Sequence, residues 1–244
     1  MRTINLLILA LCLIFTAARG HALPISVVES GSALILPNDP LYSSNYNGGT
    51  IAAFASGNPA AGYPIYGMIL WKFNLASYTN QMFNGDVTIT CGQNWGEAGP
   101  LPFRLYTVVS NWDETAVTWQ NFLGPNTTNN NPPYGSFPGN NQAFTNALGV
   151  QLALVQCIGT SNPANPSGTN NWTFPGSLIQ SWLSNPASNK GVALVPDMWG
   201  NMMWCTRSRV WDLTRAPTLM AEVIPEPATL ALIGAGLLLA LRRR

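Results

Sequence analysis

Hydrophobic and polar residues alternate with a period of two in several stretches of the chain. In residues 69–74, Ile69, Trp71 and Phe73 fall on one face and the polar side chains on the other, and residues 87–91 alternate in the same way. This alternation is typical of half-buried strands. It predicts further strands at residues 101–109, 115–120, 151–157, 191–195, 203–207 and 218–223.

Turn-forming residues separate these stretches. Asn84-Gly85 stands directly before the strand at 87–91 and predicts a tight turn, because both residue types tolerate positive φ. Residues 126–142 and 161–171 are dense in Asn, Pro and Gly, and such segments cannot bury apolar area. We therefore expect both to be surface loops.

Only residues 177–183 have the spacing of a helix, with Leu178, Ile179 and Trp182 on one side. Many short strands separated by Gly, Pro and Asn turns predict an all-β fold. The expected architecture is a jelly-roll-like β-sandwich with one short helix, in a single domain at residues 23–223.

The N-terminal segment, residues 1–22, has a different character. Arg2 precedes the apolar run 6–15, and Gly20 and Ala22 place small side chains at the −3 and −1 positions of a cleavage site. This pattern is typical of a secretory signal peptide. We therefore expect the protein to be exported.

Composition excludes several classes of function. His21 is the only histidine and lies in the signal peptide, so histidine-dependent triads, Cys/His dyads and His-ligated zinc are excluded from the processed protein. Between the two ends, six cationic side chains stand against ten acidic ones, a net charge of −4. A nucleic-acid partner requires a basic surface and is not expected.

At the C-terminus, residues 228–241 form a run of 14 uncharged residues that is followed by the arginines 242–244. As a helix the run reaches ~21 Å, less than the ~30 Å hydrocarbon core, so the arginines and the flanking segment have to help it span. The positive-inside rule keeps the arginines cytoplasmic. We expect a single C-terminal transmembrane helix; the alternative, a buried core helix, would not end in three arginines.

The motif Pro225-Glu226-Pro227, the apolar run and the arginine cluster occur in the order of a known sorting signal. Residues 224–244 resemble the PEP-CTERM sorting tail of Gram-negative bacteria that make exopolysaccharide. The resemblance implies recognition of the motif by an exosortase-type enzyme, a transient anchor in the inner membrane, and delivery to the cell surface or extracellular matrix. The tail is also labelled an ice-binding protein C-terminal domain, which describes a neighbour of the tail and not an antifreeze activity.

Short segments of the body occur in the order of a second known pattern; they are residues 43–46, 71–75, 112–121, 178–182, 189–192, 207–209 and 215–219. They resemble the DNRLRE-type domain of secreted bacterial proteins, and residues 112–121 are the most specific piece. Lys72 departs from the pattern, in which arginine is common at this position. Some members resemble carbohydrate-binding modules, so the resemblance implies a β-sandwich and an acidic exopolysaccharide as partner.

Cationic side chains supply candidate ligand contacts. Arg104 and Tyr106 are two apart on a predicted strand and share a face, where they could contact a uronate or serve a lyase with tyrosine as the base. Packing explains this pair equally well. Arg207 and Arg209 also share a face and could clamp carboxylates or pair with nearby aspartates. Lys72 is a further candidate.

Tryptophans are the other candidates, because an aromatic ring packs against the apolar face of a pyranose. Trp95, Trp172 and Trp199 lie in Gly-rich or Asn-rich segments and are the better ligand candidates. The tryptophans in apolar patterns are assigned to the interior; they are Trp71, Trp119 and Trp182.

Adjacent carboxylates occur at Asp113 and Glu114. Neighbours on a strand point to opposite faces, so they make a poor acid/base pair, and we expect them to accept hydrogen bonds from turn amides. No cofactor motif is evident in the sequence, whereas a structural calcium site built from loop Asn, Asp and carbonyl oxygens stays open.

Three cysteines remain after removal of the signal peptide, namely Cys91, Cys157 and Cys205. An oxidising compartment allows at most one intramolecular bridge among them, and the sequence does not choose the pairing.

Three functional classes follow. The first, which we prefer, is a noncatalytic surface or matrix protein whose sandwich binds polysaccharide. The second is a structural or adhesive surface protein without sugar specificity. The third is a polysaccharide lyase that uses Arg104 and Tyr106.

Overall fold

The computed structural model describes residues 22–35, 54–55, 68–92, 95–96, 100–123, 146–158, 169–196, 203–204 and 216–225. Its strands are β1 (Leu23–Ile35), β2 (Phe54–Ala55), β3 (Met68–Phe73), β4 (Gln81–Phe83), β5 (Asp86–Gly92), β6 (Trp95–Gly96), β7 (Pro100–Val108), β8 (Leu148–Ile158), β9 (Thr169–Pro175), β10 (Val192–Pro196), β11 (Met203–Trp204) and β12 (Thr218–Pro225). The helical turns are η2 (Ala76–Tyr78), α2 (Trp119–Leu123), η3 (Gly176–Leu178), α4 (Ser181–Ser184) and η4 (Pro186–Ser188). The predicted all-β class is confirmed.

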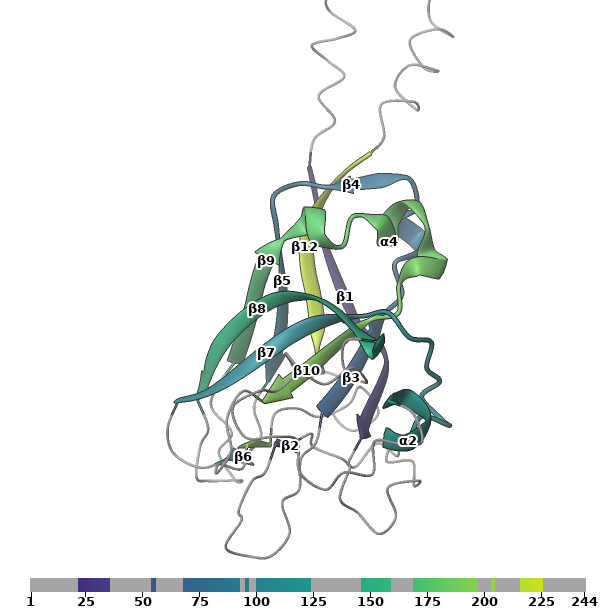
Figure 1. Ribbon diagram of the computed structural model, residues 1–244. Coiled ribbons are helices and arrows are strands. Elements are labelled where there is room, and N and C mark those ends of the chain that lie inside the picture. The colour runs from purple at the N-terminus through teal and green to yellow at the C-terminus, as the bar shows by residue number, and fades with distance from the viewer. Residues whose placement is uncertain are drawn as a thin grey trace, which may run out of the picture.

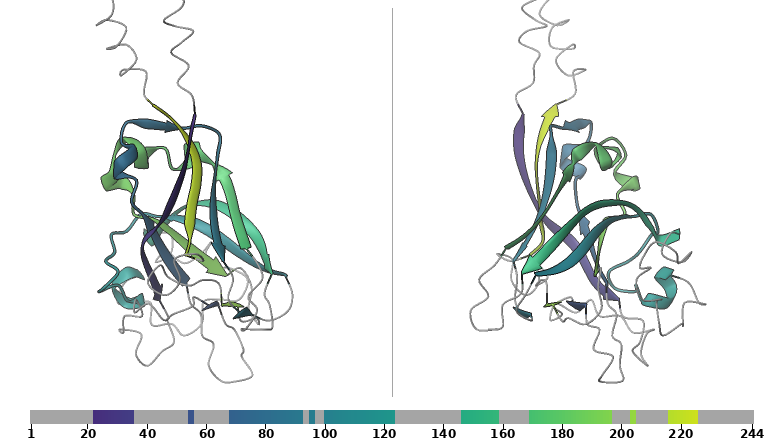
Figure 2. Two further views of the ribbon diagram at one scale, coloured as in Figure 1. Left: turned by 180° about the vertical axis from the view of Figure 1, so that it is seen from behind. Right: turned by 60° about the vertical axis from the view of Figure 1, so that its left-hand side comes forward.

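Nine of the strands form two antiparallel layers that share β1, and β2, β11 and β6 form a separate small sheet (Figures 1 and 2). The strand order is β8-β7-β10-β3-β1-β12-β5-β9, and β4 also pairs with β12. The first part of β1 pairs with β12 and its second part with β3, with an irregularity between Glu29 and Gly31. This bulge lets one strand pass from the first layer to the second. Since β8 and β9 also contact each other, the sandwich is nearly closed.

The main core lies between the two layers. It contains the largest fully buried rings, among them Trp71, Phe73 and Trp172. A second cluster lies on the opposite face of β3, β10 and β7, where Trp112, Phe122 and other side chains from residues 112–123 pack over it. As a result β3 is buried on both faces, and Leu70, on the same face as Lys72, is fully buried in the second cluster.

Five strands escaped the sequence analysis: the short strands β2, β4 and β6, and the longer strands β1 and β9. In β1 the buried residues Ile25, Glu29, Gly31, Ala33 and Ile35 keep a period of two, but Glu, Gly and Ala at three of these positions give little apolar signal. In β9 the buried residues Asn170, Trp172 and Phe174 alternate with exposed ones, but the Asn-rich composition concealed this alternation. The loop expected at residues 161–171 therefore ends before Thr169.

The strand predicted at residues 115–120 is wrong. This segment forms a turn and then α2, and reciprocal hydrogen bonds start the helix. The Thr118 backbone N–H donates to Asn121 Oδ1 at 2.8 Å, and the Asn121 N–H donates to Thr118 Oγ1 at 3.2 Å. Local side-chain hydrogen bonds of this kind outweigh the strand preference of Thr and Val.

The Asn84-Gly85 turn is also different from the prediction. Gly85 has φ +78, whereas Asn84 is not in the left-handed region. The flanking strands β4 and β5 both pair with β12, so the two residues form an insertion along one edge of β12 and not a hairpin.

The helical segment at residues 177–183 is confirmed as η3 followed by α4. Ile179, Trp182 and Leu183 are buried, as the helical spacing requires. Leu178 is 39% exposed, so its assignment to the buried side is wrong.

The signal peptide and the predicted helix at residues 228–241 lie outside the described residues. Within the described ranges no helix is long and apolar enough to cross a membrane.

Candidate functional site

Arg104 and Tyr106 lie on the same face of β7, as the sequence predicts, and on the face opposite to the main core. Both side chains meet one amide oxygen on the neighbouring strand. Arg104 Nη1 donates to Gln151 Oε1 at 2.7 Å, and the Tyr106 hydroxyl donates to the same oxygen at 3.2 Å. We call Arg104, Tyr106 and Gln151 the β7–β8 cluster.

Strand register explains why the cluster forms. Tyr106 is directly opposite Gln151, and Arg104 is opposite Leu154, so Arg104 reaches Gln151 along a diagonal. Tyr106 is buried against the second core cluster, which fixes its ring, while Gln151 is exposed. The side chain of Leu154 is 46% exposed beside them. The cluster therefore places a guanidinium, a hydroxyl and an apolar side chain on an open strand pair.

Sequence analysis missed Gln151 altogether. Its signal is the cross-strand register of β7 and β8, which includes an irregularity at Leu105 and Tyr106 and cannot be read from one strand.

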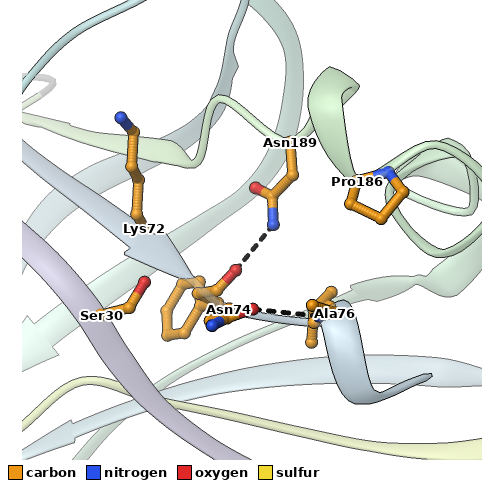
Figure 3. Close-up of a pocket in the computed structure, with 8 residues that line it drawn as sticks. Ser30, Lys72, Asn74, Ala76, Pro186 and Asn189 are labelled. Carbon is orange, nitrogen blue, oxygen red and sulfur yellow. Dashed lines mark hydrogen bonds between the residues drawn. The ribbon is translucent and has the colours of Figure 1, made fainter. Parts of the chain in front are cut away.

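Lys72 lies elsewhere, beside an open pocket of ≈ 230 Å³ between β3, β1 and η4 (Figure 3). Asn189 Nδ2 donates to the Phe73 carbonyl at 2.7 Å, and Asn74 Oδ1 accepts from the Ala76 N–H at 3.0 Å, so both amides on its wall brace the backbone.

The amino group of Lys72 is engaged with its surroundings. Its Nζ donates to the Trp112 carbonyl and stands 4.4 Å from the centroid of the Trp112 ring. Burial lowers the pKa of Lys72; the nearby Asp113 carboxylate opposes this shift, and the Lys190 cation adds to it. The Lys72 side chain therefore links the segment 112–115 to β3, and these contacts make its charge less available to a ligand.

Asp113 and Glu114 both accept hydrogen bonds from backbone amides; the expected turn amide is confirmed for Asp113, whereas the amide bound by Glu114 belongs to strand β1. Asp113 Oδ1 accepts from the Thr115 N–H at 2.7 Å and from the Thr115 hydroxyl at 2.5 Å. Glu114 Oε1 accepts from the Ser32 N–H of β1 at 3.0 Å. Trp112 Nε1 donates to the Lys190 carbonyl at 2.7 Å, so the whole segment is tied to the sheet.

The turn at Asp113 predicts an acid-dependent loss of stability. The hydrogen bonds from Thr115 hold the pKa of Asp113 below its ordinary value of 3.8. A depressed folded-state pKa contributes stability that is present above the ordinary value and is lost as the pH falls through the folded-state pKa. We expect Asp113→Asn to flatten the decline in unfolding free energy below about pH 4, measured by urea denaturation at a series of pH values.

Thr115→Val is the matched control for this prediction. It removes the hydroxyl that contributes most to the shift but keeps the carboxylate and the Thr115 backbone amide. The decline in unfolding free energy at acid pH should then be intermediate between that of the parent protein and that of Asp113→Asn. Identical acid profiles for all three proteins would show that Asp113 does not couple to folding.

The tryptophans and the remaining arginines that the sequence singles out have different outcomes. Trp172 is not a loop residue: it is fully buried in β9 and packs edge-on against Trp71, with ring centroids 6.0 Å apart. The interior assignments of Trp71 and Trp182 are confirmed. The side chains of Trp95 and Trp119 lie outside the described residues, as do Arg207, Arg209 and Trp199.

Cys91 is fully buried in the main core. Cys205 and the side chain of Cys157 lie outside the described residues, so the pairing stays open. No three His, Cys, Asp or Glu side chains in the described ranges gather as a metal site would require. The calcium prediction concerns loop oxygens and stays a prediction.

Comparison with known families matches residues 223–244 to the PEP-CTERM protein-sorting motif. No curated protein matches the chain. The motif marks an exported protein that an exosortase-type enzyme sorts to the cell surface. Its first proline, Pro225, is the last residue of β12, and Glu226 and Pro227 lie outside the described residues.

Proposed function

We propose that this exported protein binds an acidic polysaccharide at the cell surface or in the extracellular matrix, without catalysis, through the β7–β8 cluster. The observation that carries the proposal is the convergence of Arg104 and Tyr106 on Gln151 Oε1. A guanidinium carries a positive charge and presents its N–H donors in one plane. Such a fork matches the geometry of a carboxylate, the anionic group of a uronate.

The neighbouring groups suit a sugar ring. Leu154 is exposed beside Arg104 and supplies apolar surface of the kind that packs against a pyranose face. The sequence resemblance to DNRLRE-type domains supports the same class of ligand. The loop residues Arg207, Arg209, Trp95 and Trp199, and Lys72 at its separate pocket, remain candidate contacts.

The cluster favours binding over elimination chemistry. The Tyr106 hydroxyl donates a hydrogen bond to Gln151 Oε1 and keeps its proton, whereas a lyase base has to accept a proton from the substrate. The lyase alternative keeps one supporting observation, the shared acceptor that brings the Arg104 cation close to the Tyr106 hydroxyl.

Removing the guanidinium should weaken binding selectively. We expect Arg104→Ala to lower affinity for uronate-containing polysaccharides by about 10- to 100-fold, because a charge-assisted hydrogen bond contributes about 1.5–3 kcal/mol. A glycan array of the purified protein, with and without calcium, identifies the ligand, and titration of that glycan measures the loss.

Lys190→Gln provides the control, because it removes the same charge from a half-buried position on another part of the surface. Equal losses in both variants would indicate nonspecific charge attraction. Absence of any glycan ligand would favour a structural or adhesive protein. An unsaturated product that forms with the parent protein and disappears with Tyr106→Phe would establish the lyase instead.

The tail makes a separate prediction. We expect the protein released at the cell surface to lack the segment beyond the Pro225-Glu226-Pro227 motif, and Glu226→Ala to leave the uncleaved form in the membrane. Glu222→Ala, four residues earlier on β12 and exposed, should be processed normally. Mass spectrometry of the released fraction decides, and peptides from residues 230–241 in that fraction would contradict the sorting function.

A further inference from the structure

Both terminal segments leave the sandwich at the same end. Leu23, the first residue of β1, pairs with Val223 near the end of β12, so the strand that follows the signal peptide and the strand that precedes the tail lie side by side (Figure 1). On its other edge, the end of β12 pairs with β4, where Pro225 is opposite Gln81 and Ile224 is opposite Met82.

A third segment completes this end. Gln180 binds β4 as a neighbouring strand would: its Oε1 accepts from the Phe83 N–H at 2.8 Å, and its Nε2 donates to the Gln81 carbonyl at 3.1 Å. The Gly176 N–H also donates to the Gly85 carbonyl at 3.0 Å. Residues 176–180 are therefore fixed against β4.

Large apolar side chains are exposed on each of these segments. Leu23 on β1 is 50% exposed, Met82 on β4 is 51% exposed, and Leu178 in η3 is 39% exposed. Ile224 of β12 is half-buried opposite Met82, whereas Leu23 is opposite Val223 and so borders this end from the other face of the sheet. We call Leu23, Met82, Leu178 and Ile224 the apolar rim.

The length of chain that follows the rim restricts where it can lie. Only Glu226 and Pro227 separate Pro225 from the apolar run 228–241. Three Cα steps span at most about 10 Å, and each headgroup layer of a bilayer is about 5–8 Å thick. When the run is inserted, the end of β12 must lie at the headgroup layer.

The short length of the apolar run also favours a position of the β12 end close to the membrane. A 14-residue helix reaches ~21 Å against a hydrocarbon core of ~30 Å, and such a mismatch draws flanking residues toward the membrane. We propose that, before processing, the apolar rim rests in the interfacial region of the bilayer that holds the tail. The proposal depends on the membrane-inserted tail of the proposed function.

The positions of the charged side chains indicate that the contact between the rim and the bilayer is apolar. The cations of the described residues, Lys72, Arg104 and Lys190, lie on none of the segments that form the rim. Among the described residues, therefore, no cation on these segments attracts anionic headgroups, and we expect raised salt to leave the contact unchanged. The rim holds the folded body against the membrane and presents the Pro225 end of β12 at the depth where a membrane-embedded processing enzyme works.

Photocrosslinking of the full chain tests this contact. A diazirine analogue of methionine is placed at position 82 in host cells that lack the exosortase, so that the uncleaved form accumulates. Position 150 is the control, because Val150 is 54% exposed but lies on β8, away from the rim. Irradiated membranes are analysed by mass spectrometry at low and high salt. We expect a lipid adduct at position 82 in several-fold excess over position 150, with no effect of salt.

The possible outcomes distinguish a failure of the rim contact from a failure of the membrane-inserted tail. If the chain stays in the membrane fraction but position 82 gives no lipid excess, or gives adducts with protein only, the bilayer contact is wrong and the sorting function stands. If the chain is not retained in the membrane fraction at all, the membrane-inserted tail is wrong, and the rim contact fails with it. A lipid excess that high salt abolishes would overturn the apolar nature of the contact.

Discussion

Replacing Gly191 by alanine is expected to destabilise the sandwich by at least about 4 kcal/mol, a loss comparable to the whole stability of a marginal domain. Gly191 has φ +86, which costs an L-residue about 1–2 kcal/mol. An added Cβ would also lie 2.0 Å from the carbonyl oxygen of Trp71. That oxygen belongs to the backbone of a central strand, so it cannot turn away as a side chain would.

The consequences of this clash extend to both core clusters. Gly191 precedes β10, which pairs with β3 on one side and with β7 on the other. Its carbonyl accepts from the Val108 N–H at 2.9 Å, so the glycine also fixes the end of β7. Moving Gly191 away from Trp71 would separate the strands that carry the candidate site.

Gly85→Ala isolates the effect of close approach from that of backbone conformation. Gly85 has a similar φ of +78, but nothing lies within 4 Å of its added Cβ. We expect a loss of only about 1–2 kcal/mol. Urea denaturation of residues 23–225, which include all of β12, measures both variants. Equal losses would show that the conformation alone matters at Gly191.

Regular alternation made much of the sheet predictable. The sequence of β5 alternates regularly, whereas β3 and β10 are mostly apolar runs, and the structure has strands at the ranges predicted around β3, β5, β7, β10 and β12. Alternation gives no clear signal in β1, where the buried positions Ile25, Glu29, Gly31, Ala33 and Ile35 keep a period of two but include a Glu, a Gly and an Ala. It also fails where side-chain capping competes, as at Thr118 and Asn121.

The candidate site was predictable only in part. Spacing placed Arg104 and Tyr106 on one face, because this follows from the geometry of a single strand. Gln151 comes from a different strand, 45 residues from Tyr106, and its position depends on register. The charge of Lys72 is visible in the sequence, but the Trp112 carbonyl and ring that engage its amino group are not.

The second large effect is expected at Trp172, the residue whose Asn-rich surroundings suggested a ligand contact. Its side chain is fully buried between the layers and meets Trp71 at an interplanar angle of 61°. We expect Trp172→Ala to lower the unfolding free energy by about 3–5 kcal/mol, because it leaves a large cavity in the main core. Denaturation in urea, followed by far-ultraviolet circular dichroism, measures the loss.

Trp172→Phe separates the ring from its polar atom and is the informative control. Within the described part of the chain, neither Trp71 Nε1 nor Trp172 Nε1 has a hydrogen-bond acceptor, so each buried N–H carries an uncompensated desolvation penalty. Phenylalanine keeps most of the apolar contact and removes that penalty, so its loss should be well below that of Trp172→Ala. If Trp172→Ala loses almost no stability but reduces glycan binding, Trp172 lies at the surface and is a ligand contact. If phenylalanine loses as much as alanine, the indole N–H has a partner, and the packing between Trp71 and Trp172 is not what holds the layers together.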